Sequence, residues 1–297
     1  MSAWTDLGQG VWVRRSQVVD MNSLVLEQGD WSVIVDPGVL PSELDDISRR
    51  VARSTPRFDR VVLALTHPHW DHLLGRPWFP AAATIAHVGF HDEADRDVDS
   101  IRREAEQHAS EAGEVWPSRF EPFRPSHAVR GTAGIELGPF SIIAHDTPGH
   151  CSSHLAFWFP EQRVFAAGDL LSDIEIPWLD AAPWVYRRTL TQLHWVMEQE
   201  DIRVLVPGHG SPALGRLEAY RRLLRDIDYV LALESAIAAQ RARGASLEAA
   251  EAELIRLDYL GKDDPVYPTN PIHAGNIRIA WETSDESELE PLDPQDS

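Results

Sequence analysis

The six residues His67-Pro68-His69-Trp70-Asp71-His72 carry the strongest structural signal in this sequence. They place three histidines and one aspartate directly after the apolar run 60–66, RVVLALT. Histidine is the commonest metal ligand near neutral pH, and aspartate adds an anionic oxygen. Without a cation, such a cluster repels itself when protonated and is costly to desolvate when buried. The stretch therefore predicts a metal-binding loop at the end of a strand that is buried on both faces.

Three shorter motifs follow other apolar runs in the same way. They are Thr147-Pro148-Gly149-His150, Ala167-Gly168-Asp169 and Pro207-Gly208-His209-Gly210. Loops at strand ends hold side chains against a rigid scaffold, and glycines let backbone approach a cation closely. A single histidine in such a loop is more often a hydrogen-bonded residue than a ligand. The four motifs taken together are what point to a metal site.

The surrounding pattern predicts alternating strands and helices. Short apolar runs predict strands at 10–13, 23–26, 31–35, 60–66, 83–87, 140–144, 154–159, 163–167 and 203–206. Helical spacing predicts helices at 41–54 with Ser42 as N-cap, at 186–198, at 217–243, and from a Ser246 N-cap to residue 257. The charged segment 91–112 predicts a solvated helix that could cover the site as a lid. Two strand-rich halves, each with helices, predict a mixed α/β (α+β) fold of αββα type.

The chain divides into three parts by composition. Residues 1–213 carry the strands and all four motifs, and residues 214–281 predict a helical subregion packed on the same domain. Residues 282–297 hold seven acids and no basic residue, which predicts a disordered tail.

Charge and composition narrow the partners. The 297 residues contain 27 Lys and Arg against 47 Asp and Glu, a net charge of −20, which disfavours nucleic acid. The single cysteine, Cys151, excludes an internal disulfide and fits a reducing compartment. We find no signal peptide and no uncharged apolar run long enough to span a membrane. We therefore expect a cytoplasmic protein that acts on a small-molecule substrate.

The HxHxDH stretch, followed in order by Gly149-His150, Gly168-Asp169 and Gly208-His209, resembles the metallo-β-lactamase superfamily of hydrolases. The fifth motif of that family is matched by Asp36-Pro37-Gly38, and the resemblance spans about residues 10–210. It implies an αββα sandwich of two mixed sheets with metals at one edge. It also implies ligands for two metals: His67, His69 and His150 for one, Asp71, His72 and His209 for the other, and Asp169 bridging both. Asp36 is implied as a supporting residue, although a simple turn aspartate is an alternative.

The implied chemistry is hydrolysis by a hydroxide shared between two divalent ions. Asp71 would orient this nucleophile and accept its proton. Zinc suits the nitrogen and oxygen ligands best, and iron or manganese would also fit. The Pro- and Trp-containing segment 176–186, with Trp70, Trp116, Phe120 and Phe123, suggests an apolar wall, although such aromatics are more often core. The preferred substrate is therefore an ester or thioester of a small, apolar acyl group.

Other members of the family are alternatives. A glyoxalase II-like thioesterase or a mononuclear-iron sulfur dioxygenase would carry a Gly/Arg segment after the bridging aspartate, where this chain has Leu170-Leu171-Ser172. A lactonase would carry a tyrosine in the place of Ser172, unless Tyr186 substitutes. A non-catalytic metal-binding protein is a further alternative, which the complete ligand set disfavours.

The sequence leaves several assignments open. His154, Trp178, Trp184, Tyr186 and His273 are candidates for substrate contact, with hydrogen-bonding or core roles as alternatives. The remaining histidines, His87, His91, His108, His127, His145 and His194, are assigned to the surface or the core. The apolar stripe in 217–243 could pack inside the domain or support a homodimer.

Overall fold

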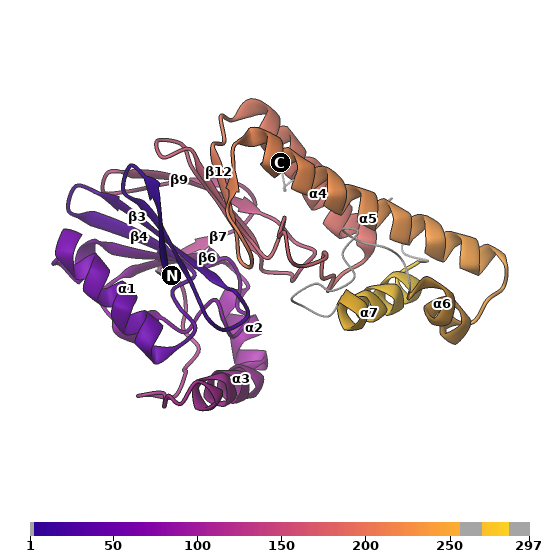
Figure 1. Cartoon of the computed structure of the whole chain (residues 1–297), viewed down its shortest axis with the longest axis horizontal. Coiled ribbons are helices and arrows are strands. Elements are labelled where there is room, and N and C mark those ends of the chain that lie inside the picture. The colour runs from indigo at the N-terminus through magenta and orange to yellow at the C-terminus, as the bar shows by residue number, and fades with distance from the viewer. Residues whose placement is uncertain (1–2, 256–268, 285–297) are drawn as a thin grey trace.

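Two β-sheets pack face to face at the centre of the fold (Figure 1). The structure is a computed structural model, and it describes residues 3–255 and 269–284. The first sheet has the order β1-β2-β3-β4-β5-β6-β7, with strands Trp4–Gly8, Val11–Arg15, Asn22–Gln28, Trp31–Val35, Val61–Ala64, Ala83–His87 and His127–Val129. The second has the order β13-β12-β11-β10-β9-β8, with strands Ala213–Leu214, Val204–Pro207, Val164–Gly168, Leu155–Phe159, Phe140–Asp146 and Ala133–Leu137.

Both sheets are mixed. In the first sheet the pairs β1–β2, β2–β3 and β3–β4 are antiparallel, whereas the pairs β4–β5, β5–β6 and β6–β7 are parallel. In the second sheet only β11 and β12 are parallel. Parallel pairs bring the carboxyl ends of neighbouring strands to one edge, which is where the loops with the predicted ligands begin.

Strand β5 shows why the central strands are apolar on both faces. Val62 and Ala64 belong to the core between the two sheets, whereas Val61 and Leu63 belong to the cluster beneath α1 (Pro41–Ser54). Successive side chains of a strand point to opposite faces, so a continuous apolar run fits a strand covered on each side. The prediction of a doubly buried strand at this position is confirmed.

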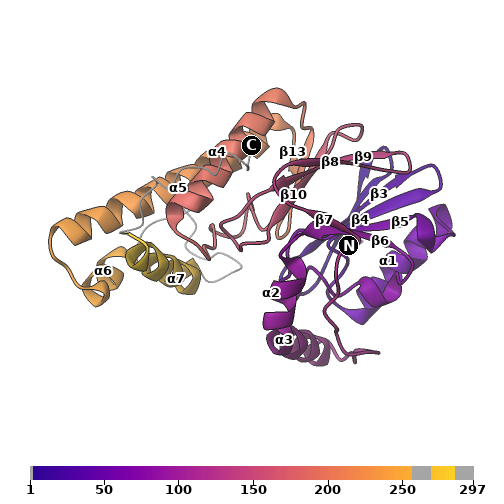
Figure 2. The ribbon, with the colours of Figure 1, turned by 180° about the vertical axis from the view of Figure 1, so that it is seen from behind.

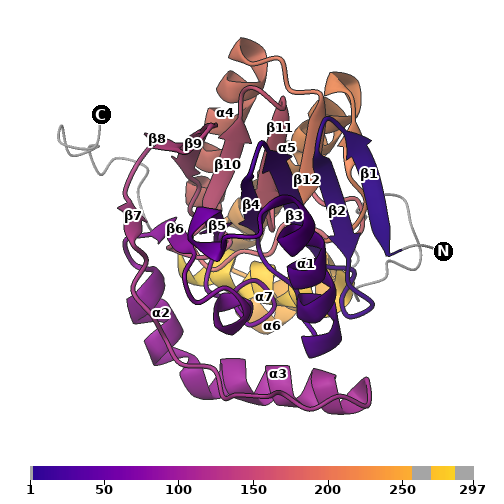
Figure 3. The ribbon, with the colours of Figure 1, turned by 90° about the vertical axis from the view of Figure 1, so that its left-hand side faces the viewer.

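Helices cover the outer face of each sheet, which gives the four layers that lie side by side in Figure 1, and Figure 3 looks onto this stack from the side of α1. Helix α1 packs on the first sheet, and α4 (Pro183–Gln199) and α5 (Arg216–Ala242) pack on the second. The predicted αββα architecture is confirmed. Four strands were not predicted, β1, β7, β8 and β13, and neither was the helix α7 (Thr269–Glu282).

The first helix begins two positions earlier than a Ser42 N-cap requires. Its N-cap is Leu40, and the carboxylate of Glu43 accepts the backbone N–H of Leu40 at 3.2 Å. The Ser42 hydroxyl instead donates to Glu114 at 2.6 Å. The predicted cap is therefore wrong, because a glutamate in the first turn takes over the free backbone donors.

The charged segment 91–112 forms two short helices rather than one. They are α2 (Phe90–Arg96) and α3 (Val98–Glu111), which meet at Asp97. The His108 ring on α3 stacks on Trp70 with the ring centroids 4.6 Å apart. Trp70, Trp116, Phe120 and Phe123 all pack in the apolar cluster of these helices. These four aromatics therefore have the core role, and the helices support the His67–His72 loop from the side of Trp70.

The C-terminal helices extend from the second sheet (Figures 1 and 2). Ser246 caps α6 (Leu247–Leu254) by accepting the backbone N–H of Ala249 at 3.3 Å, as predicted. Helix α7 closes against α5 through Ile277 and Ala280. The predicted end of α6 at residue 257 and most of the predicted tail, 285–297, lie outside the described residues. The domain boundary at residue 213 stays a prediction.

In the described part of the chain, no helix is long and apolar enough to cross a membrane.

Candidate metal centre

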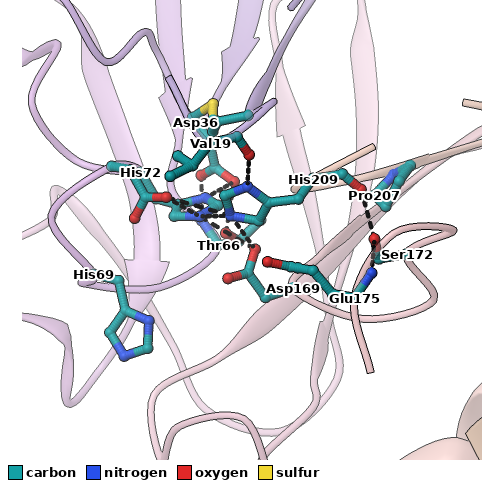
Figure 4. Close-up of polar contacts among 12 residues, drawn as sticks. Val19, Asp36, Thr66, His69, His72, Asp169, Ser172, Glu175, Pro207 and His209 are labelled. Atoms are coloured by element: carbon teal, nitrogen blue, oxygen red, sulfur yellow. Dashed lines mark hydrogen bonds and ion pairs between the residues drawn. The ribbon is translucent and has the colours of Figure 1, made fainter. Parts of the chain in front are cut away.

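The seven predicted ligands come from loops at the ends of strands in both sheets. Residues 67–72 follow β5 of the first sheet, and His150 lies in the turn between β9 and β10 of the second. Asp169 follows β11 directly, and His209 follows β12. The structure brings all seven side chains together at one edge of the sandwich (Figure 4 draws part of this site).

The first cluster consists of His67, His69, His150 and Asp169, with potential ligand atoms within 4.8 Å of one another. His150 Nε2 lies 3.1 Å from His69 Nδ1. Oδ2 of Asp169 lies 3.3 Å from His150 Nε2 and 3.5 Å from His67 Nε2. Four nitrogen and oxygen atoms thus converge on one point.

The second cluster consists of Asp71, His72 and His209, again within 4.8 Å. The two Nε2 atoms of His72 and His209 are 3.3 Å apart, and Oδ2 of Asp71 lies 3.3 Å from His209 Nε2. Oδ1 of Asp169 lies 3.2 Å from His72 Nε2 and 3.4 Å from His209 Nε2. Asp169 therefore turns one carboxylate oxygen toward each cluster.

The outer ring nitrogens fix which atoms face inward. Nδ1 of His150 donates to the Trp178 carbonyl at 3.2 Å, and Nδ1 of His209 donates to the Val19 carbonyl at 2.7 Å. Because carbonyls only accept, each Nδ1 atom carries a proton, which leaves Nε2 as the inward-facing atom that can bind a cation. At His209 burial opposes protonation, but Glu175, Asp169 and Asp71 outweigh it and raise the pKa well above its usual value, so the carboxylates here favour a positive charge such as a metal ion.

Two buried atoms and the ligand spacing also fit metal ions. Within residues 3–255 and 269–284, Nε2 of His67 and Oδ1 of Asp169 are buried and make no hydrogen bond. A tetrahedral ion with bonds of about 2.0–2.1 Å separates its ligands by about 3.3 Å. The distances between ligand atoms in both clusters lie close to this value. The donor set and its geometry indicate a site for divalent metal ions.

The pKa values of the histidines differ between the two clusters. Burial, with the like charge of His72, lowers the pKa of His67 well below its usual value, and burial lowers that of His69 to about 4. Both rings are therefore neutral ligands at pH 7. At His72 burial opposes protonation, but Asp169, Asp71 and Asp36 outweigh it and raise the pKa. These three carboxylates thus stabilise positive charge at the second cluster, and metal ions would supply that charge.

Asp36 is a supporting residue and not a simple turn aspartate. It is buried, with a left-handed backbone at φ +48°, and Oδ2 accepts Nδ1–H of His72 at 2.9 Å. The same carboxylate accepts the backbone N–H and the hydroxyl of Thr66 at 2.8 and 2.6 Å. Thr66 Oγ1 in turn accepts Nδ1–H of His67 at 3.0 Å. One carboxylate therefore orients one histidine in each cluster.

This arrangement predicts the effect of Asp36→Asn. The amide places an N–H donor where the histidine and Thr66 need an acceptor, so the two rings lose their orientation. We expect the affinity for metal to fall about 10- to 100-fold, measured by competition with a chromophoric chelator. The exposed Asp59→Asn variant is the control and should bind as the wild type does. Equal affinity in both variants would rule out the supporting role.

A second set of contacts holds the loop around His150. Nε2 of His154 accepts the backbone N–H of Asp169 at 3.2 Å, and its Nδ1 pairs with Thr147 Oγ1 at 2.8 Å. The hydroxyls of Ser152 and Ser153 both donate to the carboxylate of Glu93 on α2. His154 thus has the hydrogen-bonding role and holds the backbone of a ligand.

The position before His209, which Gly208 occupies, has no room for a side chain. A Cβ at this position would collide with Oδ1 of Asp169, so any other residue would push the carboxylate away from the second cluster.

Among the candidate substrate contacts, Trp178 is the one the structure favours. Its side chain is 53% exposed, and its ring centroid lies 6.4 Å from that of His69 and 6.1 Å from that of His150. Tyr186 is fully buried in the core of the second sheet and packs on Gly149, so it is not available as a substrate phenol. Trp184 lies in the first turn of α4, where the Arg188 guanidinium sits over its ring.

His273 has the hydrogen-bonding role that the sequence left open. It is buried inside α7, where it pairs with the Tyr229 hydroxyl at 2.8 Å and the Leu254 carbonyl at 2.8 Å. It therefore joins α7 to α5 and to the last carbonyl of α6, and it does not meet the predicted ligands. Its neighbour Asn276 holds the Trp178 loop instead, through the Leu179 N–H and the Pro177 carbonyl.

Glu175 is the site residue that the sequence analysis missed. Its carboxylate lies beside Asp169 and His209 in Figure 4. Burial raises its pKa to about 7, with Asp169 and Asp71 adding to the rise and His209 opposing it. Its backbone N–H donates to Ser172 Oγ at 3.2 Å, and Ser172 donates to the His209 carbonyl at 2.9 Å. An acid between two isoleucines, in Ile174-Glu175-Ile176, was the available signal.

Comparisons with known proteins agree with the fold. Residues 18–231 match the metallo-beta-lactamase superfamily, so the chain belongs to that family. It is similar to two proteins named hydroxyacylglutathione hydrolase. One, from a Methylobacterium species, is 29% identical over 109 residues, which are 37% of this chain and 33% of that protein. The other, from Methylobacterium nodulans, is 23% identical over 220 residues, or 68% of this chain and 75% of that protein.

Solved structures show the same fold at low identity. The stereoselective inverting sec-alkylsulfatase from Pseudomonas sp. has a TM-score of 0.73 at 14% identity, covering 94% of this chain and 49% of that chain. A metallo-beta-lactamase family protein from Thermus thermophilus has a TM-score of 0.65 at 18% identity, covering 94% of both chains. The chain thus spans about half of the alkylsulfatase and a third of the first Methylobacterium relative. The chain therefore belongs to the metallo-beta-lactamase superfamily and carries two groups of side chains that could hold divalent metal ions.

Proposed function

We propose that this chain is a binuclear metallohydrolase that cleaves an ester or thioester of a small, apolar acyl substrate. The observation that carries the proposal is Asp169, which offers one oxygen to each of two complete ligand clusters. His67, His69 and His150 would hold one ion, and Asp71, His72 and His209 the other. Zinc is the ion we propose, because three imidazoles and a carboxylate form a set that it commonly takes.

Two such ions would lower the pKa of a shared water and polarise the bond to be cleaved. The residues of the chain divide the remaining work. Asp71 turns Oδ2 toward the second cluster, where it can accept a proton from the nucleophile. Asp36 and His154 keep the histidines and the Asp169 backbone in place. Trp178 offers an apolar face beside His69 and His150 for the acyl group.

The rim of the site supports an apolar rather than an anionic substrate. The loop after Asp169 carries Asp173 and Glu175, and the nearby Arg222 and Arg225 donate to carbonyls of that loop. An anionic tail of the glutathione type would meet carboxylates here, so the substrate of the Methylobacterium relatives is the second candidate. A thioester is common to both readings. A lactone is the third candidate.

A substrate panel tests the proposal. Zinc-loaded protein is assayed on short acyl thioesters, aryl esters, lactones, hydroxyacylglutathione, phosphodiesters and alkyl sulfates. We expect the highest kcat/KM on apolar acyl thioesters or aryl esters, with loss of turnover after chelation. Preference for hydroxyacylglutathione would select the second candidate. Activity confined to phosphodiesters or sulfates would overturn the substrate class.

Trp178 allows a matched test of the apolar wall. Trp178→Ala should raise KM about 10-fold for an apolar acyl substrate and leave kcat nearly unchanged, because it removes binding that ground and transition state share. The control is Trp195→Ala, which removes an equally exposed tryptophan from α4. Equal KM values in the two variants would remove Trp178 from the substrate wall.

A further inference from the structure

Helix α5 is apolar on two opposite faces, and within residues 3–255 and 269–284 only one of them is packed in the core. One face packs into the core through Ala219, Leu223, Asp226, Val230, Leu233 and Ile237. The opposite face carries Leu217, Leu224 and Leu231, which are 67%, 49% and 45% exposed. These three leucines recur every seven residues, the spacing of a seam between paired helices. We call them the α5 leucine stripe.

One basic and one acidic residue lie between the leucines of the stripe, in an order that would pair opposite charges if two copies met antiparallel. Arg221 and Asp228 are exposed on the same face, between the first and second and between the second and third leucines. The basic residue thus lies in the N-terminal half and the acidic residue in the C-terminal half. Arg221 makes one loose contact, 3.9 Å to Glu218, which leaves its guanidinium open to a better partner.

We propose that two copies of this chain pair through the α5 leucine stripe, antiparallel, about a two-fold axis at Leu224. Under this symmetry Leu224 meets its own copy, and Leu217 meets Leu231 of the second chain. Arg221 of one chain then lies opposite residue 227 of the other, next to its Asp228. The two-fold axis creates this contact twice. A parallel pairing would instead set Arg221 against Arg221 and Asp228 against Asp228, which repel. The charge order therefore selects the antiparallel arrangement.

The length of the stripe determines the affinity that we expect for the dimer. Leu217 and Leu231 are separated by fourteen residues, or about 21 Å of helix. One helix pair of this length gives an interface near the lower end of the sizes found for stable complexes. We therefore expect a dimer with a Kd in the micromolar range, which dissociates on dilution. The stripe lies on α5, which extends from the second sheet (Figures 1 and 2).

Sedimentation of the full-length, metal-loaded protein is the first test. Wild type should change from one to two chains per particle as its concentration rises through the micromolar range. Leu224→Arg should weaken pairing at least about 100-fold, because it buries two like charges at the axis. Val115→Arg, at an exposed valine outside the stripe, is the control and should pair as wild type does. A wild type that stays monomeric, or a Leu224→Arg variant that still pairs, overturns the proposal.

Charge exchange tests the register independently of folding. Arg221→Asp alone should weaken pairing, and so should Asp228→Arg alone. The two together restore the opposite-charge pairs and should recover most of the wild-type affinity. Failure of the double variant to recover, while both singles remain folded by circular dichroism, contradicts the proposed register.

Cysteine cross-linking separates the two orientations. The chain has a single native cysteine, Cys151, and it is buried, so wild type serves as the blank. With a short bis-maleimide, Leu224→Cys should cross-link, and Leu217→Cys should not. The double variant Leu217→Cys with Leu231→Cys should cross-link again. Cross-linking of Leu217→Cys by itself would show a parallel pair and overturn the antiparallel arrangement.

Discussion

Asp169→Asn should bind about one metal ion or fewer per chain, where wild type binds about two, and should lose at least about 10³-fold in kcat/KM. The asparagine keeps the size of the side chain but removes the negative charge that faces both clusters. One oxygen becomes an N–H donor, which cannot bind a cation, so the link between the clusters is broken. Elemental analysis of dialysed protein and single-substrate kinetics measure the two losses.

The control for this variant lies in the same loop. Asp173→Asn alters a carboxylate four residues further on, which accepts the Ser211 N–H at 2.7 Å and belongs to neither cluster. It should keep about two ions per chain and lose less than about 10-fold in kcat/KM. If both variants lose metal equally, the loss comes from the loop and Asp169 is not the bridge.

Removal of metal from the wild type is expected to abolish turnover and to lower Tm by about 5–10 °C. The loss of stability follows from the buried carboxylates of Asp71 and Asp169, which lose the positive charge of the ions and are then balanced only by protonation of His72 and His209. Addition of two equivalents of zinc should restore both activity and Tm, as measured by titration against a thermal shift and an ester assay.

The same titration distinguishes hydrolysis from oxygen chemistry. Full activity at one equivalent of iron, with uptake of oxygen, would replace the hydrolase by a mononuclear-iron dioxygenase. Full restoration of Tm without turnover on any ester would instead favour a metal-binding protein without catalysis. Either result would contradict the proposed function.

Much of this site could be predicted from the sequence because its residues are marked locally. His67 to His72 follow a doubly buried strand, and His150, Asp169 and His209 each follow a glycine at a strand end. The structure brings these residues together, as the motifs predicted. The contacts that support them join distant parts of the chain, and no local pattern reveals such pairing.

The features that the sequence analysis missed or predicted wrongly also depend on contacts between distant parts of the chain or on position in the fold. Strand β1 is mostly polar and half exposed at a sheet edge, so its sequence shows no apolar alternation. The segment 91–112 has continuous helical spacing, but the chain turns at Asp97 to pack two short helices beside Trp70. Glu175 was missed because a lone acid in an apolar stretch has many explanations until its neighbours in space are known.

The division of the ligands between the two sheets has a consequence for the order of folding. His72 and His209 belong to different sheets and are 137 positions apart, yet their Nε2 atoms must come within 3.3 Å of each other. Contacts of such long sequence separation form late, after the loop between them has closed. We therefore expect each sheet to begin folding without metal and the second ion to be captured only when the sheets have docked. Binding of that ion would then mark the end of folding, and the rate of its capture would report how fast the two sheets meet.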